Sequence, residues 1–470
     1  MDGEDFRHWA RAAADFAVRY RAGLRDLPVR ASTRPGEIVA ALPAAPPEEA
    51  EPMADLFADF ERIVVPGMTH WQHPRFFAYF PANASPASVI AEALTAAMGA
   101  QCLLWQTSPA ATEVETVAID WLRQAVGLPE GWRGVIQDSA SSATLTAFLT
   151  MRERALGFTG NREGLAGQAP VRIYASAEVH TSIDKAAWIS GIGERNLVRI
   201  PTQGVLRGMD PAALEAAIVA DKAAGLLPGG VVACVGGTGI GAMDDVAAVV
   251  KVARRHDLFV HVDAAWAGNA MICPEFRSLW AGAEGADSIV LNPHKWLGAQ
   301  FDCSAHFIRN VDQHLDTLAI QPEYLRTHGH DGIVNYSEWS IQTGRRFRAL
   351  KLWFVLRAHG LSGLREMIRN HVRWGQALAR RIAAEPGFTL ASAPVLSLFT
   401  FRHDPGDGRD GDAHMLALLQ AINDAGEIYL TPTRVDGRLA IRFQAGSMDA
   451  TQADVERAFE VIRDTARALS

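Results

Sequence analysis

An aspartate stands directly after one short apolar run that is typical of a buried strand, and a lysine stands four residues after the end of another. Lys295 follows Ser288–Leu291, and Asp263 follows Leu258–Val262. Removal from water disfavours the ammonium form, so a lysine among apolar and aromatic neighbours can act as a nucleophilic amine. Taken alone, Asp263 is more often a cap, and Lys295 is more often a side chain that packs its stem and hydrates its head. Together they indicate a site for an aldehyde with an ionisable ring.

A hydroxyl-rich helix start supplies a third feature. Residues 137–144 read Gln-Asp-Ser-Ala-Ser-Ser-Ala-Thr, after an apolar run and at the beginning of a helical pattern. Hydroxyls and backbone N–H groups at such a position bind phosphate, although the pattern alone usually marks only a cap. Pyridoxal phosphate requires a lysine for its aldehyde, an acid at its pyridine nitrogen and a phosphate site. The three features together therefore favour a pyridoxal-phosphate site.

The elements that would position these residues alternate between strand and helix. Helical patterns such as 211–224 and 244–255 separate short apolar runs. The runs lie at 134–136, 171–174, 231–234, 259–262 and 288–291. This alternation predicts an α/β fold with a parallel sheet covered on both faces. Ligands bind at the carboxyl ends of the strands in such sheets.

The two ends of the chain show other patterns. An N-terminal helix is expected because Phe6, Trp9, Ala13, Phe16 and Tyr20 recur at helical spacing, and a Pro- and Ala-rich arm follows at 42–53. After residue 347 a long helical pattern reaches about 385, and strand-like runs follow at 395–401 and 439–443. These features predict a helical N-terminal segment and a small α+β C-terminal unit.

A further helix is expected to begin at Ser108-Pro109. A hydroxyl at the cap and a proline in the first turn are typical of a helix start. Val114, Val117, Trp121 and Ala125 would then lie on one face.

Composition limits the classes of partner. The 470 residues are 49% hydrophobic and 21% charged, with a net charge of −8, which predicts two or three folded units and disfavours nucleic acid. The uncharged stretches 93–112 and 225–243 are interrupted by glycine or proline, so neither predicts a membrane helix. The N-terminus is acidic, and the four cysteines have no metal-like spacing. We expect a cytoplasmic protein without a metal or a membrane partner.

The sequence resembles the group II pyridoxal-phosphate decarboxylases, and most closely the aromatic-L-amino-acid (dopa, tyrosine, tryptophan) decarboxylases, nearly end to end. The segments that carry the resemblance are PGMTHWQHPRFFAYFPANAS (66–85), SPAATEVETVAIDWL (108–122), GVIQDSASSATL (134–145), HTSIDKA (180–186), HVDAAWAGNAMICPEFR (261–277), NPHKWLGAQFDCSAHF (292–307) and GRRFRALKLWFVLR (344–357).

The resemblance implies a fold and an assembly. The fold is the type I pyridoxal-phosphate-dependent transferase (aspartate aminotransferase-like) fold, with a mostly parallel sheet flanked by helices. Residues 1–80 would form a helical segment that packs on the partner subunit, 81–346 the large cofactor-binding α/β domain, and 347–470 the small α+β domain. The active sites would be shared across a homodimer.

The resemblance also assigns roles to residues. Lys295 would hold pyridoxal 5'-phosphate as a Schiff base, and Asp263 would pair with the pyridinium. His180 would stack on the ring and contact substrate, and Tyr324, in QPEYLRTHGH, would protonate Cα. The cofactor would be bound by Ser139, Ala140, Ser141, His180, Thr238, Asp263, Asn292, His294 and Lys295. The hydroxyl-rich run around Thr238 is thinned to Gly-Thr-Gly.

Substrate would contact Trp71, Tyr79, Phe80, Pro81, Ala82, Gln101, Leu103, His180 and Gly344. Gln101 and Leu103 would reach in from the partner subunit. Ala82 replaces a hydroxyl residue of relatives, and Gly344 is small where bulk restricts ring size. The pocket therefore leaves room for an indole as well as a phenol.

The implied reaction is the decarboxylation of an aromatic L-amino acid to the arylalkylamine and carbon dioxide. One alternative is an aldehyde synthase, although relatives of that kind tend to lose the equivalent of Tyr324 or His180, and this chain keeps both. Another is a decarboxylase for a non-aromatic amino acid; an acidic substrate would call for an arginine, and 73–85 offers only Arg75. A nucleotide-binding oxidoreductase would need an acid after its glycine turn, which the cluster at 236–241 lacks.

Overall fold

A computed structural model describes residues 1–320, 332–406, 408 and 410–469, and Tyr324 lies outside these residues. At its centre is a seven-stranded sheet in the order β1-β9-β8-β7-β6-β2-β3. The strands are β1 Arg133–Gln137, β2 Val171–Ser176, β3 Leu197–Ile200, β6 Leu227–Cys234, β7 Phe259–Asp263, β8 Ser288–Leu291 and β9 Ser304–Ile308. β9 pairs antiparallel with β1 and β8, and the other neighbouring pairs are parallel. The predicted mostly parallel α/β sheet is confirmed.

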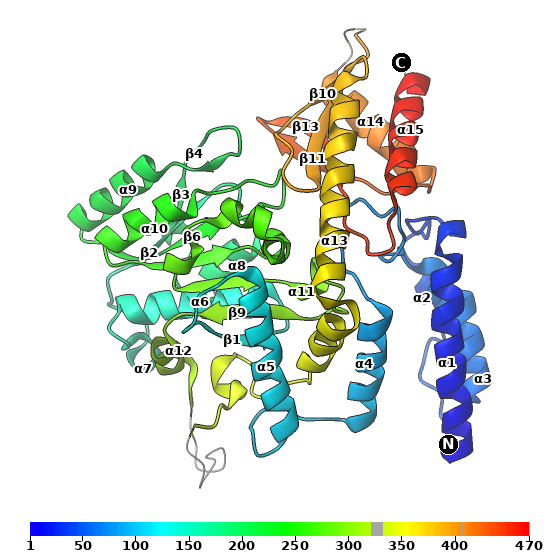
Figure 1. The fold of residues 1–470 in the computed structure, drawn as a ribbon, viewed down its shortest axis with the longest axis horizontal. Coiled ribbons are helices and arrows are strands. Elements are labelled where there is room, and N and C mark those ends of the chain that lie inside the picture. The colour runs from blue at the N-terminus through cyan, green and yellow to red at the C-terminus, as the bar shows by residue number, and fades with distance from the viewer. Residues whose placement is uncertain (321–331, 407, 409, 470) are drawn as a thin grey trace.

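Helices cover both faces of this sheet (Figure 1). In β6, Val231 and Ala233 pack into one core and Val232 into another, so the strand is buried on both sides as its continuous apolar run requires. One core contains residues of α6 and α8, and the other contains residues of α5, α9 and α10. These helices and the neighbouring α12 are α5 Pro109–Val126, α6 Ala140–Ala155, α8 Ser182–Ile189, α9 Pro211–Ala223, α10 Val246–Arg255 and α12 Val311–Leu318.

Short elements complete this part of the chain. They are α7 Gly160–Glu163, α11 Pro293–Trp296 and the two-stranded pair β4 Thr202–Gln203 and β5 Gly208–Met209.

The C-terminal residues build a second, antiparallel sheet with its own core (Figure 1). Its order is β10-β11-β13-β12, with β10 Phe388–Leu390, β11 Leu398–His403, β12 Thr431–Val435 and β13 Arg438–Gln444. Two helices, α14 Gly411–Asp424 and α15 Gln452–Leu469, pack on it. The long helix α13, Ala349–Ala384, runs beside both sheets and is interrupted at Gly360, where φ is 60°.

The N-terminal helices lie at one side of the molecule (Figure 1). They are α1 Gly3–Gly23, α2 Glu37–Ala41 and α3 Met53–Asp59. Trp9 of α1 stacks near Phe57 of α3 at 4.8 Å between ring centroids, yet all residues of α1, which the structure describes completely, are at least partly exposed. The predicted helix is present, and its apolar stripe is only partly covered, by contacts such as that of Phe16 with Phe60.

Helix α5 begins at Pro109 as predicted, but one expectation for it was wrong. The Ser108 hydroxyl does not cap the helix but donates to the carbonyl of Gln101 at 2.9 Å. Within the apolar stripe Val117 and Trp121 are exposed whereas Ala125 is buried, and the helix packs through a face that also includes Ala118 and Leu122. Small residues allow that face to approach the sheet, so its apolar signal is weaker than that of the valine and tryptophan stripe. Among the described residues, no helix has both the length and the apolar character that crossing a bilayer requires.

Candidate active site

Loops that follow five parallel strands converge at the carboxyl edge of the seven-stranded sheet. They enclose a cavity of about 250 Å³ beyond β1, β2, β6, β7 and β8. All nine residues that the sequence suggested for the cofactor line it, namely Ser139, Ala140, Ser141, His180, Thr238, Asp263, Asn292, His294 and Lys295. The position agrees with the rule that α/β sheets bind ligands at the carboxyl ends of their strands.

Lys295 lies in α11, immediately after β8, with its Nζ 4.8 Å from the centroid of the Phe80 ring. Burial lowers the pKa of Lys295 to about 8; the Asp263 carboxylate opposes this shift and the Arg442 guanidinium adds to it. Desolvation is the dominant cause because the charged ammonium loses its hydration there. A neutral, nucleophilic amine is therefore accessible near neutral pH.

Asp263 is the last residue of β7 and is 7% exposed. Its Oδ1 accepts the backbone N–H of Ala265 at 3.2 Å, a turn contact that fixes the carboxylate at the strand end. The cap expected for a lone aspartate is thus present, and the side chain also faces the cavity.

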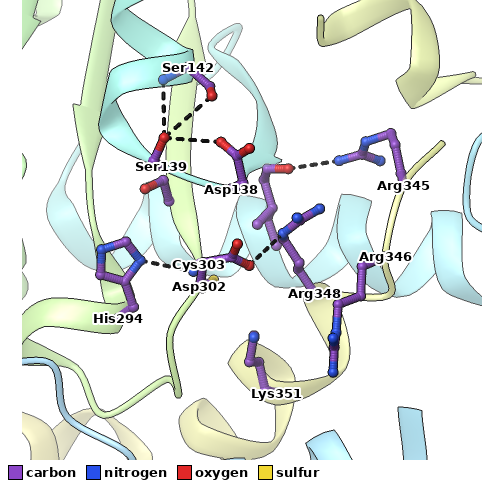
Figure 2. A network of polar contacts seen from close by, with 12 residues as sticks. Asp138, Ser139, Ser142, His294, Asp302, Cys303, Arg345, Arg346, Arg348 and Lys351 are labelled. Carbon is purple, nitrogen blue, oxygen red and sulfur yellow. Dashed lines mark hydrogen bonds and ion pairs between the residues drawn. The ribbon is translucent and has the colours of Figure 1, made fainter. Parts of the chain in front are cut away.

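The two histidines of the cavity have the same proton arrangement. The Nδ1 atom of His294 accepts the N–H of Cys303 at 2.9 Å, and the Nδ1 atom of His180 accepts the N–H of Ser182 at 3.1 Å (Figure 2 shows the first contact). Each neutral ring must therefore carry its proton on Nε2. Burial lowers the pKa of both imidazoles, that of His294 to about 3 with help from Lys295 and Lys351. Both rings can donate one N–H to a ligand.

The part of the cavity lining at the start of α6 has groups that can bind an anion. Ser139 caps α6, and its Oγ accepts the N–H of Ser142 at 3.2 Å. Asn292 accepts the Ser304 hydroxyl at 2.7 Å, which orients its amide. At Gly236, where φ is +88°, a Cβ atom would lie 2.6 Å from the Cβ of Ala267, so the chain there passes too closely for a side chain. An amine, a carboxylate and a helix start with N–H donors fit pyridoxal phosphate.

A second cavity of about 480 Å³ continues from the first and shares Lys295, His180, Thr238, Phe80 and His294 with it. It adds the predicted substrate residues Trp71, Tyr79, Pro81 and Ala82. Trp71 and Tyr79 stack with their centroids 5.6 Å apart, and Phe80 stacks on Trp266 at 4.7 Å. The wall is aromatic and apolar, as an aromatic side chain would require.

Three predicted substrate residues line neither cavity. Gly344 lies beside Gln101, whose amide would be 3.2 Å from a Cβ at that position, and the Leu103 carbonyl accepts the N–H of Ser337 at 3.1 Å. The single chain does not bring them to its own cavity. Arg75, the arginine considered for an acidic substrate, lies 3.7 Å from Asp454 and lines neither cavity.

Arg442 lines neither cavity but contacts residues that do, and the sequence reasoning missed it. It lies in β13, with its guanidinium 4.5 Å from the Phe80 centroid, and its Nε donates to the Thr238 carbonyl at 2.9 Å. Its Nη1 donates to the Tyr79 carbonyl, while Nη2 is buried without a hydrogen-bond partner among the described residues. Burial lowers its pKa to about 9. The signal was an arginine within an apolar strand, at a position whose neighbours on the same face are buried.

Comparison with known proteins agrees with this site. The model of the pyridoxal-dependent decarboxylase conserved domain matches residues 35–404. The chain is 38% identical to an aromatic-L-amino-acid decarboxylase of Sus scrofa over 100% of this chain and 98% of that protein. It is 34% identical to a phenylacetaldehyde synthase of Arabidopsis thaliana, over 100% and 97%.

Among solved structures, that of Oryza sativa TDC with PLP and tryptamine superposes with a TM-score of 0.96 at 36% identity. The match covers 100% of this chain and 99% of that one. The family model, the full-length relatives and the shared fold lead to one conclusion: the chain belongs to the pyridoxal-dependent decarboxylase family.

Proposed function

We propose that this enzyme decarboxylates an aromatic L-amino acid to the corresponding arylalkylamine and carbon dioxide, with pyridoxal 5'-phosphate held by Lys295. Membership of the family makes the protein a pyridoxal-phosphate-dependent carboxy-lyase. The observation that carries the choice of substrate is the aromatic cavity, walled by Trp71, Tyr79 and Phe80, that opens onto Lys295.

Asp263 and Lys295 would provide the cofactor chemistry. The bound cofactor supplies an electron sink for the pair left behind when carbon dioxide departs. The Asp263 carboxylate would keep the ring nitrogen protonated, because an opposite charge nearby favours the charged form. Lys295, whose pKa is about 8, would supply the amine that bonds the aldehyde.

Arg442 and His180 would orient the substrate. The free Nη2 of Arg442 is a buried donor beside the aromatic wall, suited to the α-carboxylate of an amino acid. His180 would lie against the cofactor ring and offer its Nε2–H to substrate. The apolar walls would exclude water, so that the departing carboxylate loses its solvation.

Tyr324 would return a proton to Cα, which yields an amine. The residue lies outside the described part of the chain, so this role rests on the sequence match at 321–330. Because the chain has both Tyr324 and His180, we propose the amine as the main product. An aldehyde synthase remains the second candidate because a phenylacetaldehyde synthase is among the full-length relatives.

We infer that the working enzyme is a homodimer with shared active sites. Helix α4, Pro86–Met98, exposes Ile90, Leu94 and Met98 at four-residue spacing, with exposed fractions of 57%, 46% and 57%. Covering this stripe with a second subunit would remove apolar surface from water. The partner would also receive Gln101, Leu103 and Gly344 near its pocket.

Three units would make up each subunit. Residues 1–80 would pack on the partner, 81–346 would bind the cofactor, and 347–470 would form the small domain, in keeping with two sheets that have separate cores. We infer a reducing, cytoplasmic setting, since all four cysteines are unbonded and buried.

A substrate panel tests the proposal. Purified enzyme with added cofactor is offered dopa, tyrosine, tryptophan, phenylalanine and glutamate, while amine, aldehyde, carbon dioxide and oxygen uptake are measured together. We expect amine and carbon dioxide in equal amounts from at least one aromatic substrate, without oxygen uptake. Turnover of glutamate alone would refute the aromatic assignment, and aldehyde with oxygen uptake would replace the decarboxylase with the synthase.

A further inference from the structure

A carboxylate stands directly beside the helix start at which the cofactor phosphate is expected. Asp138 precedes Ser139, the cap of α6, and its Oδ1 accepts the Ser139 hydroxyl at 3.0 Å (Figure 2). Its Oδ2 accepts the side-chain amide of Gln342 at 2.7 Å. The carboxylate is thus held from two sides at the edge of the anion site.

This arrangement uses the hydrogen that a phosphate would need. A serine hydroxyl has one proton to donate. In Ser139 that proton goes to Asp138, while the oxygen accepts the N–H of Ser142 at 3.2 Å. A phosphate that is to receive a hydrogen bond from Ser139 must therefore draw the hydroxyl away from Asp138.

Four cations lie near this carboxylate and are paired with three other acids, while the charge of Asp138 acts on Arg348 without an ion pair. Arg345 pairs with Glu115 at 2.7 Å, Arg348 with Asp302 at 2.7 Å and Lys351 with Glu92 at 2.7 Å, and Arg346 also pairs with Glu92 (Figure 2 shows these cations). Within the described part of the chain, no lysine or arginine forms an ion pair with Asp138.

The electrostatic consequence is repulsion. The N-terminus of α6 attracts one anion, and both the Asp138 carboxylate and a phosphate dianion are drawn to it. Two such negative charges at one helix start would disfavour each other's presence in a partly buried site.

We propose that Asp138 competes with the cofactor phosphate for the N-terminus of α6 and so weakens cofactor binding, which keeps the cofactor exchangeable. The inference rests on the proposed phosphate position at Ser139, Ala140 and Ser141. Gln342 holds the carboxylate in the competing position. This competition affects a ligand that carries a phosphate monoester dianion. The same aldehyde without a phosphate group is not affected.

Binding to the apoprotein tests the proposal, with cofactor uptake followed by absorbance. Pyridoxal phosphate and pyridoxal are each titrated into the wild type and Asp138→Asn, which keeps the shape and an acceptor for Gln342. We expect Asp138→Asn to bind pyridoxal phosphate at least tenfold more tightly and to bind pyridoxal within twofold of the wild type. Asp245→Asn, the same change at the cap of α10, is the matched control and leaves both affinities unchanged.

Two further measurements test whether negative charge beside Ser139 weakens the binding of phosphate. Gln342→Glu adds a second carboxylate and is expected to weaken pyridoxal phosphate at least threefold relative to pyridoxal. Inorganic phosphate is expected to raise the melting temperature of the Asp138→Asn apoprotein more than that of the wild type.

Equal or weaker binding of pyridoxal phosphate by Asp138→Asn would overturn the inference, as would an equal gain for pyridoxal. Failure of both aldehydes to bind any variant would remove the proposed function instead. The inorganic phosphate titration would then still show whether Asp138 opposes the binding of phosphate.

Discussion

Lys295 gains its reactivity from the residues around it. The centroid of the Phe80 ring lies 4.8 Å from the Nζ atom of Lys295. Phe80 stacks on Trp266, and Trp266 stacks on Trp296 with 5.1 Å between the ring centroids. These rings exclude water from the ammonium, while Asp263 limits how far its pKa falls. The same side chain on an exposed surface would be protonated almost entirely at neutral pH.

The lowered pKa of Lys295 predicts the pH dependence of cofactor uptake. The neutral amine is the reacting form, so the rate at which apoprotein bonds the aldehyde should rise about tenfold per pH unit below pH 8 and level off above it. Stopped-flow absorbance measures the rate, and division by the rate for free Nα-acetyl-lysine, whose amine has an ordinary pKa of about 10.4, removes the ionisation of the aldehyde. The ratio should then be level below pH 8 and fall about tenfold per pH unit between pH 8 and pH 10. A ratio that does not change between pH 6 and pH 10 would contradict the burial argument.

Asp263 should matter for turnover more than for binding. Asp263→Asn removes the charge that would hold the ring nitrogen protonated, and we expect kcat to fall at least about a hundredfold. Asp263→Glu keeps the charge and should retain more activity than the asparagine variant. Steady-state kinetics at saturating cofactor measure both, and equal kcat values for the asparagine variant and the wild type would exclude this role.

One buried ion pair connects helix α5 to the central sheet and to the segment that leads into α13. Glu115 accepts the N–H of Ile136 in β1 at 2.8 Å and pairs with Arg345 at 2.7 Å. Arg345 also donates to the Ile136 carbonyl at 2.8 Å. The pair therefore aligns the strand that leads into Ser139 and the cofactor cavity.

Breaking this pair should destabilise the protein strongly. Glu115→Gln leaves the buried Arg345 without its counter-charge, and we expect the free energy of unfolding to fall by about 3 to 5 kcal/mol. Glu275→Gln, which breaks an exposed pair with Arg369, should cost less than about 1 kcal/mol. Urea denaturation of the apoproteins compares them, and similar losses in both variants would contradict the argument.

The sequence predicted the parallel core because its strands are continuous apolar runs, as at Val231–Cys234. It did not reveal β9, whose Ser304 and His306 interrupt the apolar signal although the strand is buried. It also could not reveal Arg442 beside Phe80, since that contact joins strand β13 to a loop that is distant in the chain. Local sequence patterns indicate which residues are buried and where helices begin, whereas the lining of a pocket depends on which distant segments of the chain come into contact.

The whole molecule leaves apolar surface that a single chain does not cover. Helix α1 contacts α3 but no residue of it is buried, and α4 presents its stripe of Ile90, Leu94 and Met98. Figure 1 places α1 and α4 on the side of the molecule away from α9 and α10. One extended face is thus available to a second copy.

A charge on this face should separate the subunits. Leu94→Glu would bury a carboxylate in the dimer contact, and we expect a monomer with at most a few per cent of wild-type activity. Val219→Glu on α9, where the valine is 51% exposed, is the matched control and should remain a dimer. Sedimentation velocity gives the mass, and a dimeric, active Leu94→Glu variant would contradict the proposed assembly.

The proposed chemistry depends on a covalent bond between the amine at position 295 and an aldehyde cofactor. Borohydride reduction of the purified holoenzyme, followed by peptide mapping, tests it directly. We predict one pyridoxyl label, on Lys295, and none on Lys351, a second buried lysine that pairs with Glu92. A label on Lys351 or elsewhere, or an enzyme that decarboxylates without any label at Lys295, would contradict the account.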